Sequence, residues 1–587
     1  MKRWIFAITL AGAGLLTAGS LRAQDETAPL TVPLRFDHYY TYDQVVAALK
    51  LLHKTYPALT RLNLVGRSEE NREIWELTIN NQKTGDVLEK PGVYVDGNIH
   101  GNEIQAGEVC LYFASFLLTN YDKNEKITRL VDKNAYYIIP VVNVDGRYHF
   151  FADANTMHSN RGLRRPKDDD HDGRVNEDFP DDLDGDGNIC MMRKKDPNGK
   201  YKTDPEDARL MVRVKPGEKG EWTLLGNEGI DNDGDGRINE DAEGYVDPNR
   251  NWGYNWAPPY VQRGAGDYPF SGKGMKAISE FMMSHPNIIV VWAFHNNGGM
   301  ILRGPSTKNE HLNVSDISVY DYLGENGEKI LPGYKYMISW KDLYPTYGDF
   351  TDFTDNVIGS YSFVGELFRT AQETYHVMKD DQAEGTDQYG SGSRNKRSRE
   401  RLKFNDYLAM GMLYKPWTPY HHPVYGDIEI GGWVKMSTRL PHPFMQEDMV
   451  HRAAAAVMFT AEQTPEVKME LLEKKKTGKD LYRIRIRLSN GKAIPSISYQ
   501  SVSNRIYPKD LLTLTGKGVQ VVAGGRLQNE YTNEVSYKEY KPGVQFVQVP
   551  GFDKVDYQFL VQGKGPVTVK YLSRKAGKKE MVIDLKK

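Results

Sequence analysis

Residues 92–103 have the sequence Gly-Val-Tyr-Val-Asp-Gly-Asn-Ile-His-Gly-Asn-Glu. The apolar run that opens this segment does not alternate with polar residues, which is typical of a strand buried on both faces. His100 and Glu103 follow that strand, where the chain has to turn. Because such a turn can direct both side chains to one point, the segment predicts a core strand that ends in two metal ligands.

Similar apolar runs recur along the chain at residues 136–142 and 288–294, and helix-like stretches at 103–119 and 272–284 lie between them. Short buried strands that alternate with amphipathic helices predict an α/β fold, in which a mixed twisted sheet is covered by helices on both faces. We expect this domain to occupy residues 24–460.

Beyond Glu466 the composition changes. Residues 467–587 are rich in Lys, Gly and Val, and their strand-like runs include 481–486, 544–547 and 567–569. No long helical periodicity is present, so this part predicts a separate C-terminal β-sandwich domain. No motif in it indicates more than a structural or surface-contact module.

The overall composition describes a globular protein of two or three domains, with 587 residues, 39% hydrophobic and 26% charged. The formal net charge of −2 provides no general basic field, which argues against a nucleic-acid partner.

The N-terminus has the features of a cleavable signal peptide. Lys2 and Arg3 precede an apolar stretch at 4–18, and Leu21-Arg22-Ala23 is a suitable cleavage site. The apolar stretch is short and rich in Gly, which favours cleavage over a membrane anchor. We therefore expect residues 1–23 to be removed and the product to be secreted or periplasmic, without membrane insertion.

Cys110 and Cys190 are the two cysteines of the chain. Their number excludes a zinc site built on thiolates, and the sequence leaves open whether they pair.

His295 ends the apolar run Val291-Trp-Ala-Phe-His and supplies a third candidate ligand. Ligands at the carboxyl ends of neighbouring strands are what an open α/β sheet can bring together. Three protein ligands leave a fourth position of zinc open for water, which is typical of a catalytic site.

Four motifs in the same order resemble those of the zinc carboxypeptidases of the carboxypeptidase A family, over residues 36–370. They are His-Gly-Asn-Glu at 100–103, Asp-Pro-Asn-Arg-Asn-Trp at 247–252, His295, and Ser-Phe-Val-Gly-Glu-Leu at 362–367. The resemblance implies one Zn²⁺ per catalytic site and hydrolysis at peptide or protein C-termini.

The resemblance also assigns catalytic roles. Glu366 takes the proton of the attacking water and passes it to the leaving amine. Arg164 stabilises the oxyanion, with Arg165 as an alternative, and Arg161 is an outer substrate contact.

Further roles concern substrate binding. The pair Asn249 and Arg250 implies recognition of the free C-terminal carboxylate, because a guanidinium binds carboxylates in two-pronged fashion. Asp247 implies an outer carboxylate that orients His100. The closing tyrosine falls on Tyr344, with Tyr347 as an alternative.

Two positions depart from the digestive members of the family. Asn102 stands where those enzymes have Arg, and Thr351, at the specificity position, is neither clearly apolar nor acidic. The preferred C-terminal residue is therefore left open.

An insertion at about residues 166–245 contains three acidic repeats. Alternate aspartates followed by Gly form loops of oxygen ligands of the kind that Ca²⁺ prefers. The candidate ligands are Asp168, Asp170, Asp172, Asp182, Asp184, Asp186, Asp231, Asp233 and Asp235. The glutamate usual at loop position twelve is replaced by Phe179 and Ala242, so we expect structural calcium in loops that differ from ordinary EF-hands.

The leading hypothesis is thus a secreted zinc metallocarboxypeptidase. Alternatives are an enzyme that cuts cell-wall peptides as an amidase or carboxypeptidase on the same scaffold, and a non-catalytic, calcium-dependent surface binding protein. The second alternative would not need a proton shuttle such as Glu366. A non-peptidase amidohydrolase would not need the Asn249-Arg250 pair.

Overall fold

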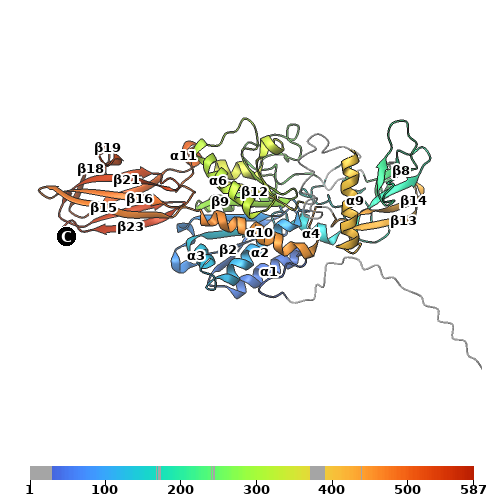
Figure 1. Ribbon diagram of the computed structural model, residues 1–587, viewed down its shortest axis with the longest axis horizontal. Coiled ribbons are helices and arrows are strands. Elements are labelled where there is room, and N and C mark those ends of the chain that lie inside the picture. The colour runs from blue at the N-terminus through green and yellow to red at the C-terminus, as the bar shows by residue number, and fades with distance from the viewer. Residues whose placement is uncertain are drawn as a thin grey trace, which may run out of the picture.

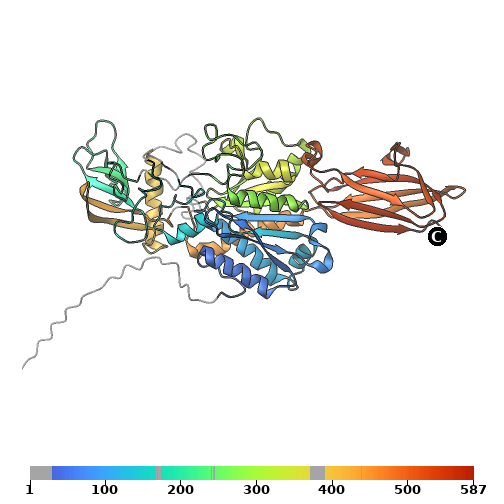
Figure 2. The ribbon, with the colours of Figure 1, turned by 180° about the vertical axis from the view of Figure 1, so that it is seen from behind.

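The computed structural model describes residues 30–166, 168, 173–239, 241, 245–369, 391–437 and 439–586. The expected signal peptide, residues 1–23, lies outside them. The molecule is elongated, with an α/β domain at its centre and a β-rich unit at each end (Figures 1 and 2). Among the described residues, no helix combines the length and apolar character that crossing a bilayer requires.

The central sheet has eight strands in the order β1-β2-β4-β3-β9-β12-β10-β11. Their bounds are β1 (Thr60–Arg67), β2 (Glu73–Ile79), β3 (Gly92–Gly97), β4 (Ala135–Ile139), β9 (Ile288–Asn296), β10 (Met300–Arg303), β11 (Lys335–Ile338) and β12 (Tyr361–Leu367). β4, β3, β9 and β12 are parallel neighbours, whereas β1, β2 and β10 make antiparallel pairs. The predicted mixed sheet is confirmed.

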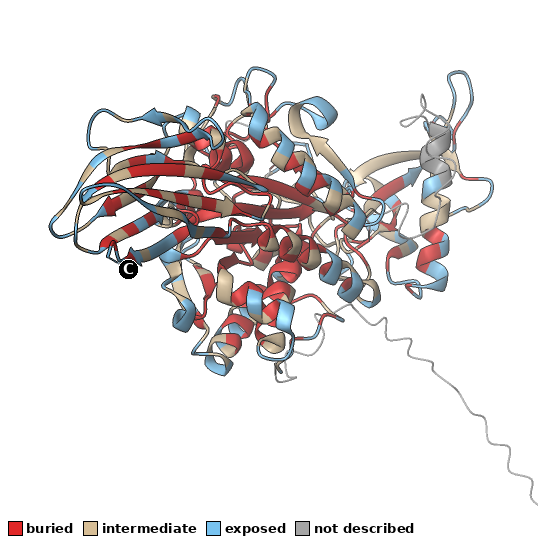
Figure 3. Ribbon diagram, turned by 60° about the vertical axis from the view of Figure 1, so that its left-hand side comes forward, coloured by how far each residue is buried: buried red, intermediate tan, exposed pale blue. Residues whose placement is uncertain are grey.

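Burial explains the continuous apolar runs of the sequence. Every residue of β3 and β9 is buried, and the central strands form the buried layer of the domain (Figure 3). β4 ends at Ile139, before Pro140, whereas the apolar pattern predicted a strand as far as Val142. Proline cannot donate to a strand ladder, which accounts for the earlier end.

Helices cover both faces of this sheet, as predicted. They are α1 (Tyr42–Thr55), α2 (Ile104–Asn120), α3 (Glu125–Lys133), α4 (Val144–Ala152), α5 (Lys273–Ser284), α6 (Val314–Ile330), α7 (Phe350–Phe353) and α10 (Pro443–Glu462). α1 starts at a capping box, in which the side chains of Thr41 and Gln44 each accept a hydrogen bond from the other residue's backbone nitrogen. α2 begins directly after Glu103 and packs on β3 and β9.

The acidic insertion forms part of a second sheet, with strand order β13-β14-β5-β8-β6-β7. Its members are β5 (Met191–Lys195), β6 (Tyr201–Thr203), β7 (Met211–Arg213), β8 (Trp222–Asn227), β13 (Tyr414–His422) and β14 (Gly426–Trp433), beside α9 (Ser391–Tyr407). This unit lies at the end opposite the C-terminal domain (Figure 1). The sequence predicted loops here. It missed the sheet, because two of its strands come from the distant segment 414–433.

The C-terminal region contains two antiparallel sheets, in the orders β15-β16-β21-β18-β19 and β20-β17-β22-β23. The elements are β15 (Val467–Gly478), β16 (Leu481–Asn490), α11 (Tyr499–Ser503), β17 (Asp510–Thr515), β18 (Val519–Asn529), β19 (Glu534–Tyr537), β20 (Val544–Val547), β21 (Asp553–Gly563), β22 (Val567–Ser573) and β23 (Gly577–Ile583). Buried and less buried residues alternate along β16, which places one face of the strand in a separate core. The predicted β-sandwich is confirmed.

Candidate metal centre and active site

Three predicted ligands meet at the carboxyl ends of neighbouring parallel strands. His100 and Glu103 lie in the turn between β3 and α2, and His295 lies on β9. All three side chains are buried. The carboxylate oxygens of Glu103 lie 3.0 Å from Nδ1 of His100 and 3.0 Å from Nδ1 of His295. The ligand atoms of these residues therefore point to one position.

The donor atoms fit a zinc ion. Nδ1 of His100 and Nδ1 of His295 face each other at 3.3 Å. Two nitrogens bound tetrahedrally to one zinc at the usual bond length lie about 3.3 Å apart. A set of two imidazole nitrogens and one carboxylate is typical of catalytic zinc sites.

Asp247 determines which nitrogen of His100 faces the cluster. Its Oδ1 lies 3.1 Å from Nε2 of His100, and it also accepts the backbone N–H of Asn249 at 2.8 Å. A proton on Nε2 leaves Nδ1 free to bind a metal. Burial opposes ionisation of Asp247, but the nearby charges of His100 and Arg250 outweigh it and hold its pKa well below the usual range.

Glu366 lies on β12 in register with His295 on the parallel strand β9. Its side chain is partly exposed. The pKa of Glu366 is raised to about 7, because loss of water around the carboxyl group and the charge of Glu103 raise it more than His295 lowers it. A carboxylate with these properties suits proton transfer at neutral pH.

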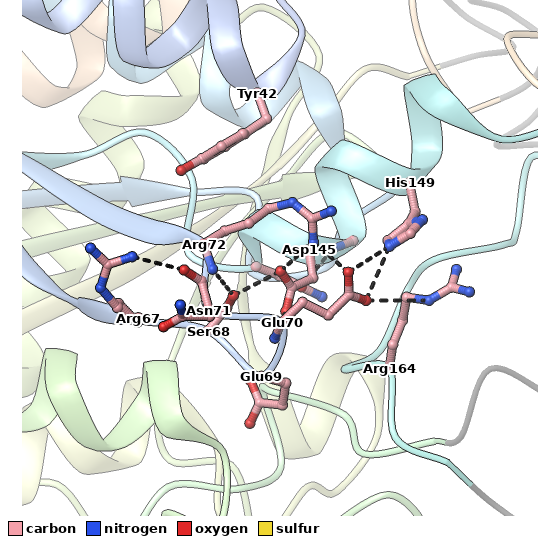
Figure 4. A network of polar contacts seen from close by, with 12 residues as sticks. Tyr42, Arg67, Ser68, Glu69, Glu70, Asn71, Arg72, Asp145, His149 and Arg164 are labelled. Atoms are coloured by element: carbon pink, nitrogen blue, oxygen red, sulfur yellow. Dashed lines mark hydrogen bonds and ion pairs between the residues drawn. The ribbon is translucent and has the colours of Figure 1, made fainter.

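The two arginines singled out by the sequence have different surroundings. Arg161 donates from Nη1 to Oε1 of Glu103 at 2.9 Å, and its Nη2 lies 3.7 Å from Asp247. Arg164 instead donates to Asn160 at 3.0 Å and lies beside Glu70, as Figure 4 shows. The structure thus brings Arg161 to the metal ligands. The contacts of Arg164 do not match the oxyanion role that the resemblance assigned to it.

Three of the four predicted substrate-binding residues, Arg161, Arg250 and Tyr344, line a cavity of about 440 Å³, and Asn249 does not. The cavity is lined by Arg161, Tyr245, Asp247, Arg250, Gln262, Arg263 and Tyr344. Arg250 is 8% exposed, whereas Tyr344 is 50% exposed and lies at the surface. The cavity therefore joins the arginine of the predicted carboxylate clamp to the aspartate that holds a metal ligand.

Asn249 and Thr351 are linked through the backbone of α7. The side-chain oxygen of Asn249 accepts the N–H of Phe350 at 2.9 Å, and its backbone carbonyl accepts Nη1 of Arg250 at 2.6 Å. Thr351, the predicted specificity position, is buried in the same helix. Asn249 therefore contacts both Arg250 and the backbone of the helix that carries Thr351.

Sequence reasoning missed Arg439. Its Nη2 donates to Oε1 of Glu103 at 3.1 Å and to the carbonyl oxygen of Asn296 at 2.5 Å. Arg439 lies beyond residue 370, where the resemblance ended, so no motif drew attention to it. Tyr245, which donates to Asp247 at 3.2 Å, was also missed, although it stands only two residues before the Asp-Pro-Asn-Arg motif.

The acidic repeats are described in part. Asp170 and Asp172 lie outside the described residues, and Asp168 accepts the N–H of Gly173 at 3.1 Å. Two acidic groups have carboxylate oxygens within 4.8 Å of one another: Asp231, Asp233 and Asp235, and Asp182 and Asp184 together with Glu228. Asp186, expected in the second group, lies 2.7 Å from Lys415.

Both cysteines are free and buried. Cys110 lies in α2 of the central domain and Cys190 precedes β5 of the second sheet. The pairing that the sequence left open is therefore absent.

Two family models match different parts of the chain. A family model described as zinc carboxypeptidase matches residues 45–212 and 226–388. A second model, described as a domain of unknown function (DUF8731), matches residues 466–584.

Similar proteins share limited stretches with the chain. Human carboxypeptidase D is 38% identical over 109 residues, which cover 19% of this chain and 8% of that protein. The catalytic chain of rat carboxypeptidase N is 35% identical over 116 residues, covering 19% and 25% respectively. The chain thus aligns with a quarter or less of the length of these relatives.

Solved structures that match the chain include thrombin-activatable fibrinolysis inhibitor, with a TM-score of 0.42, 14% identity, and 73% of this chain and 74% of that chain covered. Carboxypeptidase A of Helicoverpa armigera has a TM-score of 0.39 and 20% identity, covering 58% and 67%. The zinc carboxypeptidase model matches more than half of the chain and includes all three metal ligands. The chain therefore belongs to the zinc carboxypeptidase family.

Proposed function

We propose that the chain is a zinc metallocarboxypeptidase that hydrolyses the last peptide bond of peptide or protein substrates. His100, Glu103 and His295 would hold the ion. Bound there, zinc would polarise the scissile carbonyl and lower the pKa of water. The observation that carries the proposal is the cavity that brings Arg250 together with Asp247 and Arg161, which contact the metal ligands His100 and Glu103.

Glu366 is the proton carrier in this proposal. Its place beside His295 in the sheet, together with its partial exposure, supports proton transfer between water and the departing amine.

Arg161 and Arg439 take over the charge-stabilising role that the resemblance assigned to Arg164. Both donate to the same oxygen of Glu103, so two positive charges face the cluster from different segments. Fixed donors of this kind stabilise negative charge that develops on a carbonyl oxygen.

Arg250 recognises the free C-terminal carboxylate, and Asn249 holds it in place through its backbone carbonyl. The guanidinium fork pairs well with a carboxylate, and Arg250 is largely buried. Tyr344, half exposed at the rim, closes over the bound substrate.

Export and calcium are further parts of the proposal. Residues 1–23 have the pattern of a cleavable signal peptide, which favours a secreted or periplasmic enzyme. The acidic loops of the insertion have the oxygen-rich pattern of structural calcium sites.

Peptides that differ in their last residue, each with a free or an amidated C-terminus, test the function. We expect stepwise loss of terminal residues from free-ended peptides, inhibition by a zinc chelator and recovery on adding zinc. Arg250→Ala should lower kcat/KM for free-ended peptides by about 100-fold, the equivalent of about 3 kcal/mol of charge-assisted binding. Arg213→Ala, an exposed arginine on β7, is the matched control. Equal cleavage of amidated peptides would overturn exopeptidase action.

A further inference from the structure

Glu228 is a fully buried carboxylate at the end of β8. Its Oε1 accepts the backbone N–H of Cys190 at 2.6 Å. Its Oε2 is also buried and has no hydrogen-bond partner within the part of the chain that the structure describes. Burying an acceptor without a partner costs free energy of about 1–3 kcal/mol, more for a charged group. A positively charged ligand bound to this oxygen would offset that cost.

The unpartnered carboxylate faces an acidic loop. Glu228, Asp182 and Asp184 each offer an oxygen, and these oxygens lie within 4.8 Å of one another. Asp182 accepts the backbone N–H groups of Asp186 at 3.0 Å and Gly187 at 2.7 Å, which closes the loop around it.

We propose that Asp182, Asp184 and Glu228 together bind one Ca²⁺, with Glu228 supplying the carboxylate that the loop itself lacks. In a twelve-residue calcium loop the last position carries a glutamate that binds with both oxygens. Counted from Asp182, that position is Arg193, whose guanidinium pairs with Glu429 at 2.7 Å. Glu228 provides the missing acid from a neighbouring strand. Backbone carbonyls and water complete the six to eight oxygens that Ca²⁺ takes.

Lys415 is a cation that would compete with Ca²⁺ for the carboxylates of this acidic loop. Its ammonium group pairs with Asp184 and with Asp186, the latter at 2.7 Å. One lysine cannot balance four carboxylates, and within the described part of the chain its ion pairs are with Asp184 and Asp186 rather than with Glu228. Burial also raises the pKa of Glu228 to about 8, so without a metal this group would be largely protonated at neutral pH. A divalent ion bound to Glu228 offsets the free-energy cost of burying the ionised carboxylate. Lys415 can keep its ion pair with Asp186 at the same time.

The loop connects the insertion to both arginines of the metal centre. Ile189 donates its N–H to the carbonyl of Asn155 at 3.0 Å, and the chain runs on from there to Arg161. Asn188 accepts the N–H of Lys435 at 3.2 Å, four residues before Arg439. Ordering of the loop by calcium therefore stabilises the two segments that place these arginines.

Calcium titration of the full-length, zinc-loaded protein tests the site. Protein stripped of divalent ions and then resupplied with zinc is titrated with CaCl₂ by calorimetry, and thermal unfolding is followed in parallel. We expect the wild type to bind calcium below about 1 mM and to unfold at a higher temperature with it. Glu228→Gln should weaken one binding step at least about tenfold. Glu221→Gln, the same change at an exposed position on the same segment, should leave it unchanged.

Two further variants separate loss of the site from loss of folding. Asp184→Asn changes an exposed side chain and should weaken the same step while circular dichroism stays unchanged. Lys415→Met removes the rival cation and should tighten calcium binding. The proposal is overturned if the wild type binds no calcium at about 1 mM, if Glu228→Gln binds as the wild type does, or if Mg²⁺ raises the unfolding temperature equally.

Discussion

The molecule contains two groups of histidine, carboxylate and arginine side chains, which differ in whether they can bind a metal. Residues 161–164 connect them, because Arg161 belongs to one group and Arg164 to the other. The metal cluster consists of His100, Glu103 and His295 with Arg161 beside it. The polar network of Figure 4 includes Glu70, Arg72, Asp145, His149 and Arg164. Their residue types are similar, so the difference must come from what each nitrogen and oxygen faces.

In the polar network both ring nitrogens of His149 face carboxylates. Nδ1 lies 2.7 Å from Asp153 and Nε2 lies 2.8 Å from Glu70. Burial lowers the pKa of His149, but these two hydrogen bonds raise it more, so the pKa is higher than usual. A doubly protonated ring has no lone pair left for a metal.

In the metal cluster both ring nitrogens of His100 also lie near carboxylates, but Nδ1 faces a second histidine as well: Glu103 lies 3.0 Å from Nδ1 of His100 and 3.0 Å from Nδ1 of His295. Nε2 is held by Asp247, while Nδ1 points at Nδ1 of His295 across 3.3 Å. Two imidazole nitrogens and one carboxylate that converge on one position form a donor set for a metal, and the polar network has no second histidine nitrogen facing His149 among the described residues.

The largest expected effect tests whether the cluster holds the metal. His295→Ala should lose bound zinc and lower activity by at least about 10,000-fold, because zinc supplies several kcal/mol of transition-state stabilisation. Metal content and kcat/KM measure this. His149→Ala, the corresponding change in the polar network, should keep one zinc. Equal loss of zinc in both variants would contradict the conclusion that the metal cluster, and not the polar network, holds the zinc.

Glu366→Gln should keep zinc and lower kcat by about 100- to 10,000-fold, because an amide cannot take a proton from water. Metal analysis and steady-state kinetics on one peptide measure both quantities. Wild-type kcat in this variant would remove Glu366 from the mechanism.

Arg161 and Arg164, one in each group, test which arginine stabilises the reacting carbonyl. Arg161→Ala should lower kcat/KM by about 100-fold, as expected for loss of a fixed charge beside the reacting carbonyl. Arg164→Ala, three residues along, should change kcat/KM less than about threefold. The reverse order would restore the role that the resemblance gave to Arg164.

The smallest expected effect concerns pH. Because the pKa of His149 is raised in the folded state, its stabilising contribution is fully present below about pH 6.5 and is lost as pH rises through the folded pKa. His149→Gln should therefore lower the unfolding temperature more at pH 5.5 than at pH 9, with a free-energy difference of about 1 kcal/mol or less. A pH-independent difference would show that His149 acts by packing alone.

Several features could be predicted because they are local. A buried strand followed by a turn placed His100 and Glu103, and the apolar run at 288–294 placed His295 at the end of a neighbouring strand. The C-terminal β domain followed from its change in composition.

Other features could not be predicted because they depend on contacts between distant segments. Arg439 reaches Glu103 from beyond the second sheet, and two strands of that sheet come from residues 414–433. Glu228 stands outside every acidic repeat, yet it faces Asp182 and Asp184.

The sequence by itself predicted the core strands 92–95 and 288–294, the three metal ligands that follow them and the β-rich character of the C-terminal region, because periodicity and short-range spacing act along the chain. Only the tertiary structure shows that Arg161 rather than Arg164 contacts a metal ligand, that both ring nitrogens of His149 face carboxylates, and that Glu228 lies beside Asp182 and Asp184. These choices depend on which atoms lie within about 3 Å of each other, and hydrogen bonds and metal bonds act only over that range.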